Sequence, residues 1–300
     1  MKLAVEETMK QINDETAENM WKMVLAAFSF SIMATFVKFA CQTLPSMEVV
    51  FFRSAFGLIP MSILIVNARA SWFGKTPKIH ALRGVFGFAA LSLHFYAIAK
   101  LDLGTAVMLN YTAPMFVVIL AHIMLREKTE PRVTAAILFS FFGLYLLASP
   151  HFEAKPIPIL LGILSGLFAA IAYVLIRFSK EDKSPYTIIF YFTAISTIAS
   201  LPFVSVHFVR PTFQEWLGLI GVSVGAVFGQ VFLTRSIQKA PISYVLPFSY
   251  LTPVFATFFG LLIWKERLTL QTLMGGAIII LCGISIYFLR ERPPYVPLEE

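Results

Sequence analysis

Four polar side chains interrupt long apolar runs at a common depth: Arg53, His94, Asn110 and Tyr111. Each stands some six to eight residues from one predicted end of its run, roughly 10 Å at the helical rise of about 1.5 Å per residue. A guanidinium binds a carboxylate through two parallel hydrogen bonds, and ionisable groups inside membrane spans usually serve a function. We therefore expect these residues to converge on a substrate with a carboxylate or another anionic group.

A second polar group stands at a matching depth from the opposite end of its runs: Gln230, Ser249 and Tyr250. Two such groups flanking the midplane suit a site that opens to each side of a membrane in turn. Structural interpretations stay open for single residues. A tyrosine often only packs, His94 can be a hydrogen-bonded structural histidine, and Arg53 can pair with Glu48 or with a backbone carbonyl.

Acidic residues avoid this depth. All seventeen Asp and Glu lie in tails, loops or span ends, and we expect Arg53 to be the only Lys or Arg well inside a span. This argues against a carboxylate relay for protons or sodium and against a site for a cation. His94 can still carry a proton, because the ordinary pKa of histidine is about 6.5.

Patterns typical of other chemistry are missing from the sequence. Cys41 and Cys282 stand alone without CxxC spacing, and the five histidines show no metal-ligand spacing. There is no Gly-rich phosphate loop beside a strand and no nucleophile elbow. We expect no enzyme, no catalytic residue, no metal and no other cofactor.

The elements that position these residues are membrane helices. The chain is 58% hydrophobic and only 14% charged, whereas soluble domains carry about 25% charged residues. The apolar runs are too long for barrel strands and lack their alternation. We predict an all-α polytopic membrane protein with ten transmembrane helices, near 22–43, 47–67, 79–100, 103–125, 131–149, 157–180, 184–206, 213–238, 242–264 and 269–290.

The chain repeats itself at an offset of 139 residues, which brings Tyr111 onto Tyr250 and Pro114 onto Pro253. We predict a cytoplasmic segment 1–21, a five-helix repeat 22–149, a second repeat 157–290 and a cytoplasmic tail 291–300. Five is odd, so the repeats are inverted, as in many secondary transporters. Paired prolines bend or loosen equivalent helices and are expected to act in gating. Taken singly, each could be a packing kink.

The basic residues predict the orientation. With the N-terminus in the cytoplasm, seventeen Lys and Arg fall at inner segments and six at outer ends, as the positive-inside rule requires. The formal net charge of +7 then needs no nucleic-acid partner. Small residues at Gly221, Gly225 and Gly229, and at Gly84 and Gly87, predict close packing of those two helices against each other or against other central helices.

The two proline-containing stretches carry a family resemblance. LNYTAPMFVVILAHIMLREK and FSYLTPVFATFFGLLIWKER each end in a basic–Glu pair. With EVVFFRSAFGLIP and LRGVFGFAALSLHFYAIAKLDLGTAVMLNYTAP, they resemble the drug/metabolite transporter superfamily, EamA type, and its subgroup that contains bacterial S-adenosylmethionine uptake carriers. The resemblance covers nearly the whole chain, and it implies a secondary transporter for amino acids, nucleotide-like metabolites or organic anions.

We therefore expect a secondary transporter that moves a small polar, carboxylate-bearing metabolite by alternating access. The alternative is a carrier of S-adenosylmethionine or a nucleotide-like metabolite, and outside this class a membrane-embedded enzyme or a channel. The expected partners are the substrate and the lipid bilayer, with the chain as a monomer or homodimer. The expected location is a bacterial inner membrane, with both termini cytoplasmic.

Overall fold

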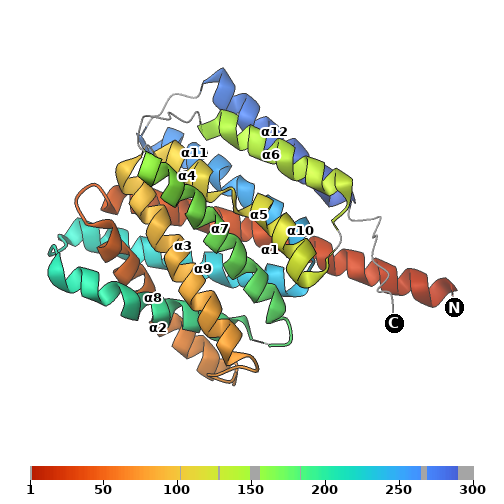
Figure 1. Cartoon of the computed structure of the whole chain (residues 1–300), viewed down its shortest axis with the longest axis horizontal. Coiled ribbons are helices and arrows are strands. Elements are labelled where there is room, and N and C mark those ends of the chain that lie inside the picture. The colour runs from red at the N-terminus through yellow and green to blue at the C-terminus, as the bar shows by residue number, and fades with distance from the viewer. Residues whose placement is uncertain are drawn as a thin grey trace.

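The computed structural model describes residues 2–101, 103–127, 129–148, 156–182, 184–264 and 269–289. Every regular element in these ranges is helical (Figure 1). They are α1 (Lys2–Ala40), α2 (Ser46–Asn67), α3 (Pro77–Lys100), α4 (Leu103–Asn110), α5 (Ala113–Leu120), α6 (Pro131–Ala148), α7 (Pro156–Phe178), α8 (Pro185–Val206), α9 (Phe213–Lys239), α10 (Ile242–Val245), α11 (Leu251–Trp264) and α12 (Leu270–Leu289), with a π-helical turn at Ala121–Leu125 and a 3₁₀ helix at Leu246–Tyr250.

Ten helical spans among the described residues are long and apolar enough to cross a membrane, and each overlaps a predicted one. The all-α fold class is confirmed. The first span differs most from its prediction, because α1 runs without a break from Lys2 and its membrane-length part begins at Asp14. Figure 1 shows the N-terminal end of this helix projecting beyond the bundle. The predicted tail 291–300 lies outside the described residues.

The helix starts follow local sequence rules. The helices α3, α6, α7 and α8 each begin at a proline, which suits the first helical turn because the missing N–H would have no partner there. Helix α9 begins with a capping box, in which the Thr212 side chain and the Glu215 side chain each accept from the other residue's backbone N–H. Short connections therefore still give well-defined helix ends.

Two spans are broken at equivalent places. The fourth span is divided into α4 and α5 by a turn at Tyr111 and Thr112, and Pro114 lies in the first turn of α5. The ninth span passes from α10 through the 3₁₀ helix into α11, and Pro253 lies in the first turn of α11. A proline within a span removes a backbone hydrogen bond, which accounts for a break on the N-terminal side of each proline.

The packing of helices follows a two-fold pattern between the halves. Helix α1 packs along α9, and α3 packs along α7. In the repeat α7 is the counterpart of α1 and α9 is the counterpart of α3, so the two contacts are equivalent. Helices α2 and α8, and likewise α6 and α12, pack against their own counterparts (Figure 1). Each half has five spans, so a two-fold axis between them makes an inverted repeat.

The glycines of α9 and the glycines of α3 pack against different helices. A Cβ on Gly225 of α9 would lie 2.9 Å from the Met33 nitrogen and from the Ser29 oxygen of α1. A Cβ on Gly84 of α3 would lie 2.5 Å from the Ile195 side chain of α8. The expectation that these two glycine-bearing helices pack on each other through these residues is wrong. The alternative, that they pack on other helices, is correct.

Candidate functional site

A cavity of about 160 Å³ lies between the two halves of the bundle. We call it the central cavity. Its walls come from α1, α2, α3, α5, α7, α8, α9 and α11 and from both broken spans. No Asp or Glu occurs among the described residues that line it. The polar side chains and prolines in its lining are Arg53, Arg83, His94, Asn110, Tyr111, Pro114, Tyr173, Gln230, Ser249, Thr252 and Pro253.

Arg53 comes from α2 and is 3% exposed. Its guanidinium carbon lies 5.4 Å from the centroid of the Phe192 ring, a distance at which a cation is attracted to the ring face. Its Nε has no hydrogen-bond partner among the described residues. The nearby Glu48 does not take this role, since its Oε2 accepts from the backbone N–H of Val209 at 3.0 Å. The Arg53 charge therefore lies in the cavity without a carboxylate partner in the described part of the chain.

Arg83 of α3 is a second buried arginine in the same cavity and is 2% exposed. Its Nη2 donates to Gln230 Oε1 at 2.9 Å, and its guanidinium carbon lies 4.1 Å from the Phe192 centroid. Its Nε and Nη1 have no partner among the described residues. Gly87 leaves room for it, because a Cβ there would lie 2.8 Å from Nη1.

Sequence reasoning missed Arg83 and grouped it with the basic residues of the inner segments. The expectation that Arg53 is the only Lys or Arg well inside a span is therefore wrong. Helix α3 begins at Pro77, which places Arg83 nearly two turns inside it. A usable signal was present in the sequence, because Arg83 stands four residues into the predicted span 79–100 and Arg53 stands six residues into the predicted span 47–67.

Most of the other predicted residues also reach the cavity. Asn110 donates from Nδ2 to Ser165 Oγ at 3.0 Å, which fixes the end of α4 against α7. His94 lines the cavity, and its Nδ1 has no partner among the described residues. Tyr111 and Ser249 line it from the two broken spans. Residues of both predicted polar groups thus line one cavity and do not form two separate sites at different depths.

Tyr250 is the predicted residue that the structure does not bring into this lining. It is 0% exposed and packs in the core, and its ring centroid lies 6.4 Å from that of Tyr111. Thus Tyr250 supports the cavity from behind Tyr111. Tyr173 of α7, which sequence reasoning did not single out, lines the cavity instead.

Contacts between the halves also lie close to the central cavity, one turn of α3 away from Arg83. Asp182 accepts from the Lys75 backbone N–H at 2.6 Å and from Thr76 Oγ1 at 3.0 Å, and its Oδ2 lies 3.0 Å from His80 Nε2. Nearby, the Thr187 hydroxyl donates to the Ser71 carbonyl at 2.7 Å. We call the contacts of Asp182 with Lys75, Thr76 and His80 the clasp. It joins the α2–α3 connection of the first half to the α7–α8 connection of the second.

Known proteins match the chain over nearly its whole length. The model of the EamA-like transporter family matches residues 20–149 and again residues 156–289. The pseudopaline exporter CntI of Pseudomonas aeruginosa is 34% identical over 265 residues, which cover 88% of this chain and 93% of the exporter. The S-adenosylmethionine uptake transporter of Rickettsia prowazekii is 24% identical over 275 residues, covering 90% and 92% of the two chains.

The same fold occurs in a solved crystal structure, with a TM-score of 0.78 at 15% identity over 94% of this chain and 99% of that chain. The double family match agrees with the duplication seen at an offset of 139 residues. With ten apolar spans, the molecule is an integral membrane protein, and the chain belongs to the EamA-like transporter family.

Proposed function

We propose that this protein is a secondary transporter that moves a small, carboxylate-bearing metabolite across a bacterial inner membrane by alternating access. The observation that supports it is the pair Arg53 and Arg83, buried at 3% and 2% exposure in a cavity whose described lining contains no acid. The proposal includes no catalytic step and no cofactor.

The two buried guanidiniums have no acidic counter-charge among the described residues that line the cavity. Removing an ion from water costs several kcal/mol unless a partner of opposite charge offsets it. The contacts with Phe192 and Gln230 offset only part of that cost, since a cation–π contact contributes about 0.5–2 kcal/mol. A carboxylate between the guanidiniums supplies the missing charge and satisfies the unpartnered N–H groups. The two buried arginines therefore favour an anionic substrate.

Alternating access assigns roles to the broken spans and to the clasp. Pro114 and Pro253 both line the central cavity, so a change in the bend of either span alters the wall of the site. The clasp holds the halves together at the end that the charge distribution assigns to the cytoplasm. Opening it would give the cavity access to that side. This arrangement follows the general pattern of a site at the interface between inverted repeats.

S-adenosylmethionine or a nucleotide-like metabolite is the second candidate substrate. It is favoured by the aromatic lining of the cavity, where Tyr111, Tyr173 and Phe192 offer faces on which an adenine can stack. The name of the Rickettsia relative points the same way. Against it, a sulfonium is a cation, and two buried arginines repel it. An acid without a fixed positive charge suits the cavity better.

A ligand screen on the purified full chain tests the proposal. Thermal melting is compared with amino acids, S-adenosylmethionine, monocarboxylates and di- and tricarboxylates, each added at the same concentration. A ligand that binds only the folded state raises the melting temperature. We expect the largest rise with an organic acid, and saturable transport of that acid into proteoliposomes. A rise with S-adenosylmethionine alone would support the second candidate and contradict the first.

A further inference from the structure

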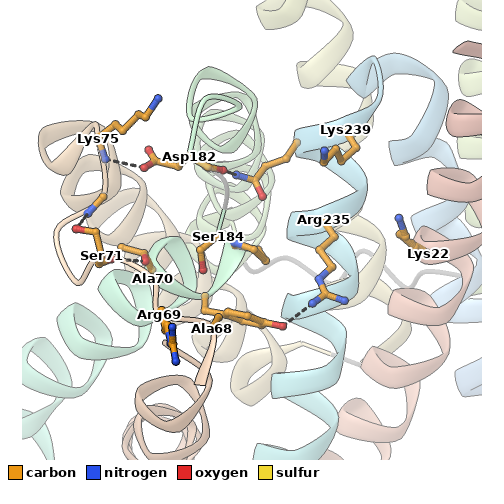
Figure 2. A pocket seen from close by; sticks show the side chains of 15 residues that line it. Lys22, Ala68, Arg69, Ala70, Ser71, Lys75, Asp182, Ser184, Arg235 and Lys239 are labelled. Carbon is orange, nitrogen blue, oxygen red and sulfur yellow. Dashed lines mark hydrogen bonds between the residues drawn. The ribbon is translucent and has the colours of Figure 1, made fainter. Parts of the chain in front are cut away.

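A larger hollow lies beyond the clasp, at the same end of the bundle. It has a volume of about 820 Å³ and takes residues from α1, from the α2–α3 and α7–α8 connections, and from the ends of α8 and α9. We call it the vestibule. Five basic side chains are among its lining residues: Lys22, Arg69, Lys75, Arg235 and Lys239. Figure 2 shows Arg235 and Lys239 on one helix, with Arg69 on the opposite side.

The one acid among the described lining residues does not neutralise these cations. Asp182 accepts through Oδ1 from the Lys75 backbone N–H (Figure 2). Through Oδ2 it contacts Thr76 and His80. Lys22 pairs with Glu18 at 2.9 Å, and Arg235 donates to the phenolic oxygen of Tyr186. The vestibule therefore carries a net positive charge within its own walls.

The α2–α3 connection, which forms one wall of the vestibule, is held in place by hydrogen bonds. The Ser71 hydroxyl accepts from the backbone N–H groups of Phe73 and Gly74 at 3.3 and 3.1 Å. Gly74 has a φ of 66°, and a Cβ there would lie 2.6 Å from His80 Nε2. The same Asp182 that forms the clasp holds Lys75 of this connection. The backbone of one vestibule cation, Lys75, is thus held by the clasp.

Helix α9 links the vestibule to the central cavity. Gln230, which accepts from Arg83, lines the central cavity, whereas Arg235 and Lys239 line the vestibule. At about 1.5 Å per residue, Arg235 lies only some 7 Å along the helix from Gln230. The two hollows are therefore consecutive along the bundle.

We propose that the vestibule is a second anion site, which binds a soluble molecule with more than one acidic group on the cytoplasmic side of the clasp. The ligand chemistry is that of carboxylate or phosphate oxygens facing several Lys and Arg side chains. The proposal rests on the proposed function in one respect. If the protein transports an organic acid, the anion bound in the vestibule is that acid before it reaches Arg83 and Arg53.

An excess of Lys and Arg at cytoplasmic ends also arises from membrane topology alone. A matched control separates the two causes. Lys180 is exposed at the same end of the bundle but does not line the vestibule. Lys180→Gln removes one charge from this end and leaves the vestibule intact. Arg69 and Lys239 are exposed residues of the lining, so their replacement by Gln is expected to preserve the fold.

The experiment is calorimetric titration of citrate into the full chain in phosphatidylcholine nanodiscs. It is done in an Arg53→Gln background, so that the central cavity contributes little. We expect citrate to bind, and Arg69→Gln or Lys239→Gln to weaken binding about tenfold, the effect of one charged hydrogen bond. Lys180→Gln should leave the affinity unchanged. Equal weakening by Lys180→Gln and Lys239→Gln would overturn the proposal.

Failure of this inference is distinguishable from failure of the proposed function. If Arg53→Gln alone abolishes citrate binding, the vestibule is not a site and the central cavity is. If Arg53→Gln changes nothing while Lys239→Gln removes binding, the vestibule stands and the role of Arg53 fails. A lipid headgroup is tested by repeating the titrations with phosphatidylglycerol in the nanodiscs. If Lys239→Gln no longer weakens citrate binding in the phosphatidylglycerol nanodiscs, lipid fills the vestibule, which contradicts a soluble ligand.

Discussion

Arg53 and Arg83 lie against the same aromatic ring, with their guanidinium carbons 5.4 and 4.1 Å from the centroid of Phe192. The two arginines come from successive helices of the first half, and the ring comes from α8 of the second half. Two like charges brought together in a buried site repel each other. A bound anion removes that repulsion, and a molecule with two acidic groups can pair with both guanidiniums.

We therefore predict that a diacid binds more tightly than the monoacid of the same length. Succinate should bind the purified chain at least about tenfold more tightly than butyrate, because the second charged hydrogen bond contributes about 1.5–3 kcal/mol. Calorimetric titration measures both affinities. In an Arg83→Gln variant the advantage of succinate should shrink. Equal affinities of the wild-type chain for the two acids would show that only one arginine recognises the substrate.

A second prediction concerns the broken spans. Pro114→Ala and Pro253→Ala should each slow transport several-fold without reducing the amount of inserted protein, because a straightened span alters the cavity wall and keeps its apolar length. The matched control is Pro202→Ala. Pro202 also lies inside a helix, but it is exposed on the outside of α8. Normal turnover in the Pro114→Ala/Pro253→Ala double variant would show that the kinks serve packing alone.

The third prediction concerns the contact between α1 and α9. Gly225→Ala should lower the free energy of unfolding by about 1–3 kcal/mol, the usual cost of overpacking, because the new Cβ would meet α1 backbone atoms at 2.9 Å. Gly276→Ala on α12 is the control, since its nearest neighbour would lie 3.8 Å away. Denaturant unfolding of the chain in mixed micelles compares the two. A Gly225→Ala variant as stable as Gly276→Ala would contradict this packing.

Composition and spacing were enough to predict the spans and the places where two of them break. Apolar length fixes a span because lipid leaves no partner for an unpaired backbone group. A proline removes a backbone hydrogen bond and favours a break for a similar local reason, although Pro60 and Pro202 lie inside the unbroken helices α2 and α8. These properties depend on neighbouring residues in the chain, which is why the sequence alone reveals them.

The partners of each helix depend on contacts that spacing does not encode. The stripe of Gly221, Gly225 and Gly229 indicates that some helix lies close, but nothing in it specifies α1. Arg83 was missed because charge counting assigned it to the inner segments, while the helix in fact begins earlier. Tyr250 was placed in the site by its match to Tyr111. The repeats are only approximately alike, however, and the 3₁₀ helix turns Tyr250 into the core.

A fourth prediction concerns topology. In a chain whose own Cys41 and Cys282 are replaced by Ser, Lys78→Cys and Arg210→Cys place thiols at exposed positions on opposite ends of the bundle. Each substitution removes one basic residue, so the charge asymmetry between the sides is preserved. An impermeant maleimide should label position 210 in intact cells and position 78 only after permeabilisation. The reverse pattern would place the vestibule on the outer side of the membrane.

The central claim is that Arg53 and Arg83 hold the acidic group of the substrate. The most direct measurement is the affinity of Arg53→Lys and Arg53→Ala for the acid that gives the largest rise in melting temperature. We predict that Arg53→Lys loses about 1–3 kcal/mol of binding free energy, because lysine keeps the charge without the planar fork. Arg53→Ala should remove binding at the central cavity, leaving only the vestibule binding that Lys239→Gln weakens, and should still melt near the wild-type temperature. An Arg53→Ala chain that binds this acid normally but melts far earlier would contradict the account, because Arg53 would then be structural.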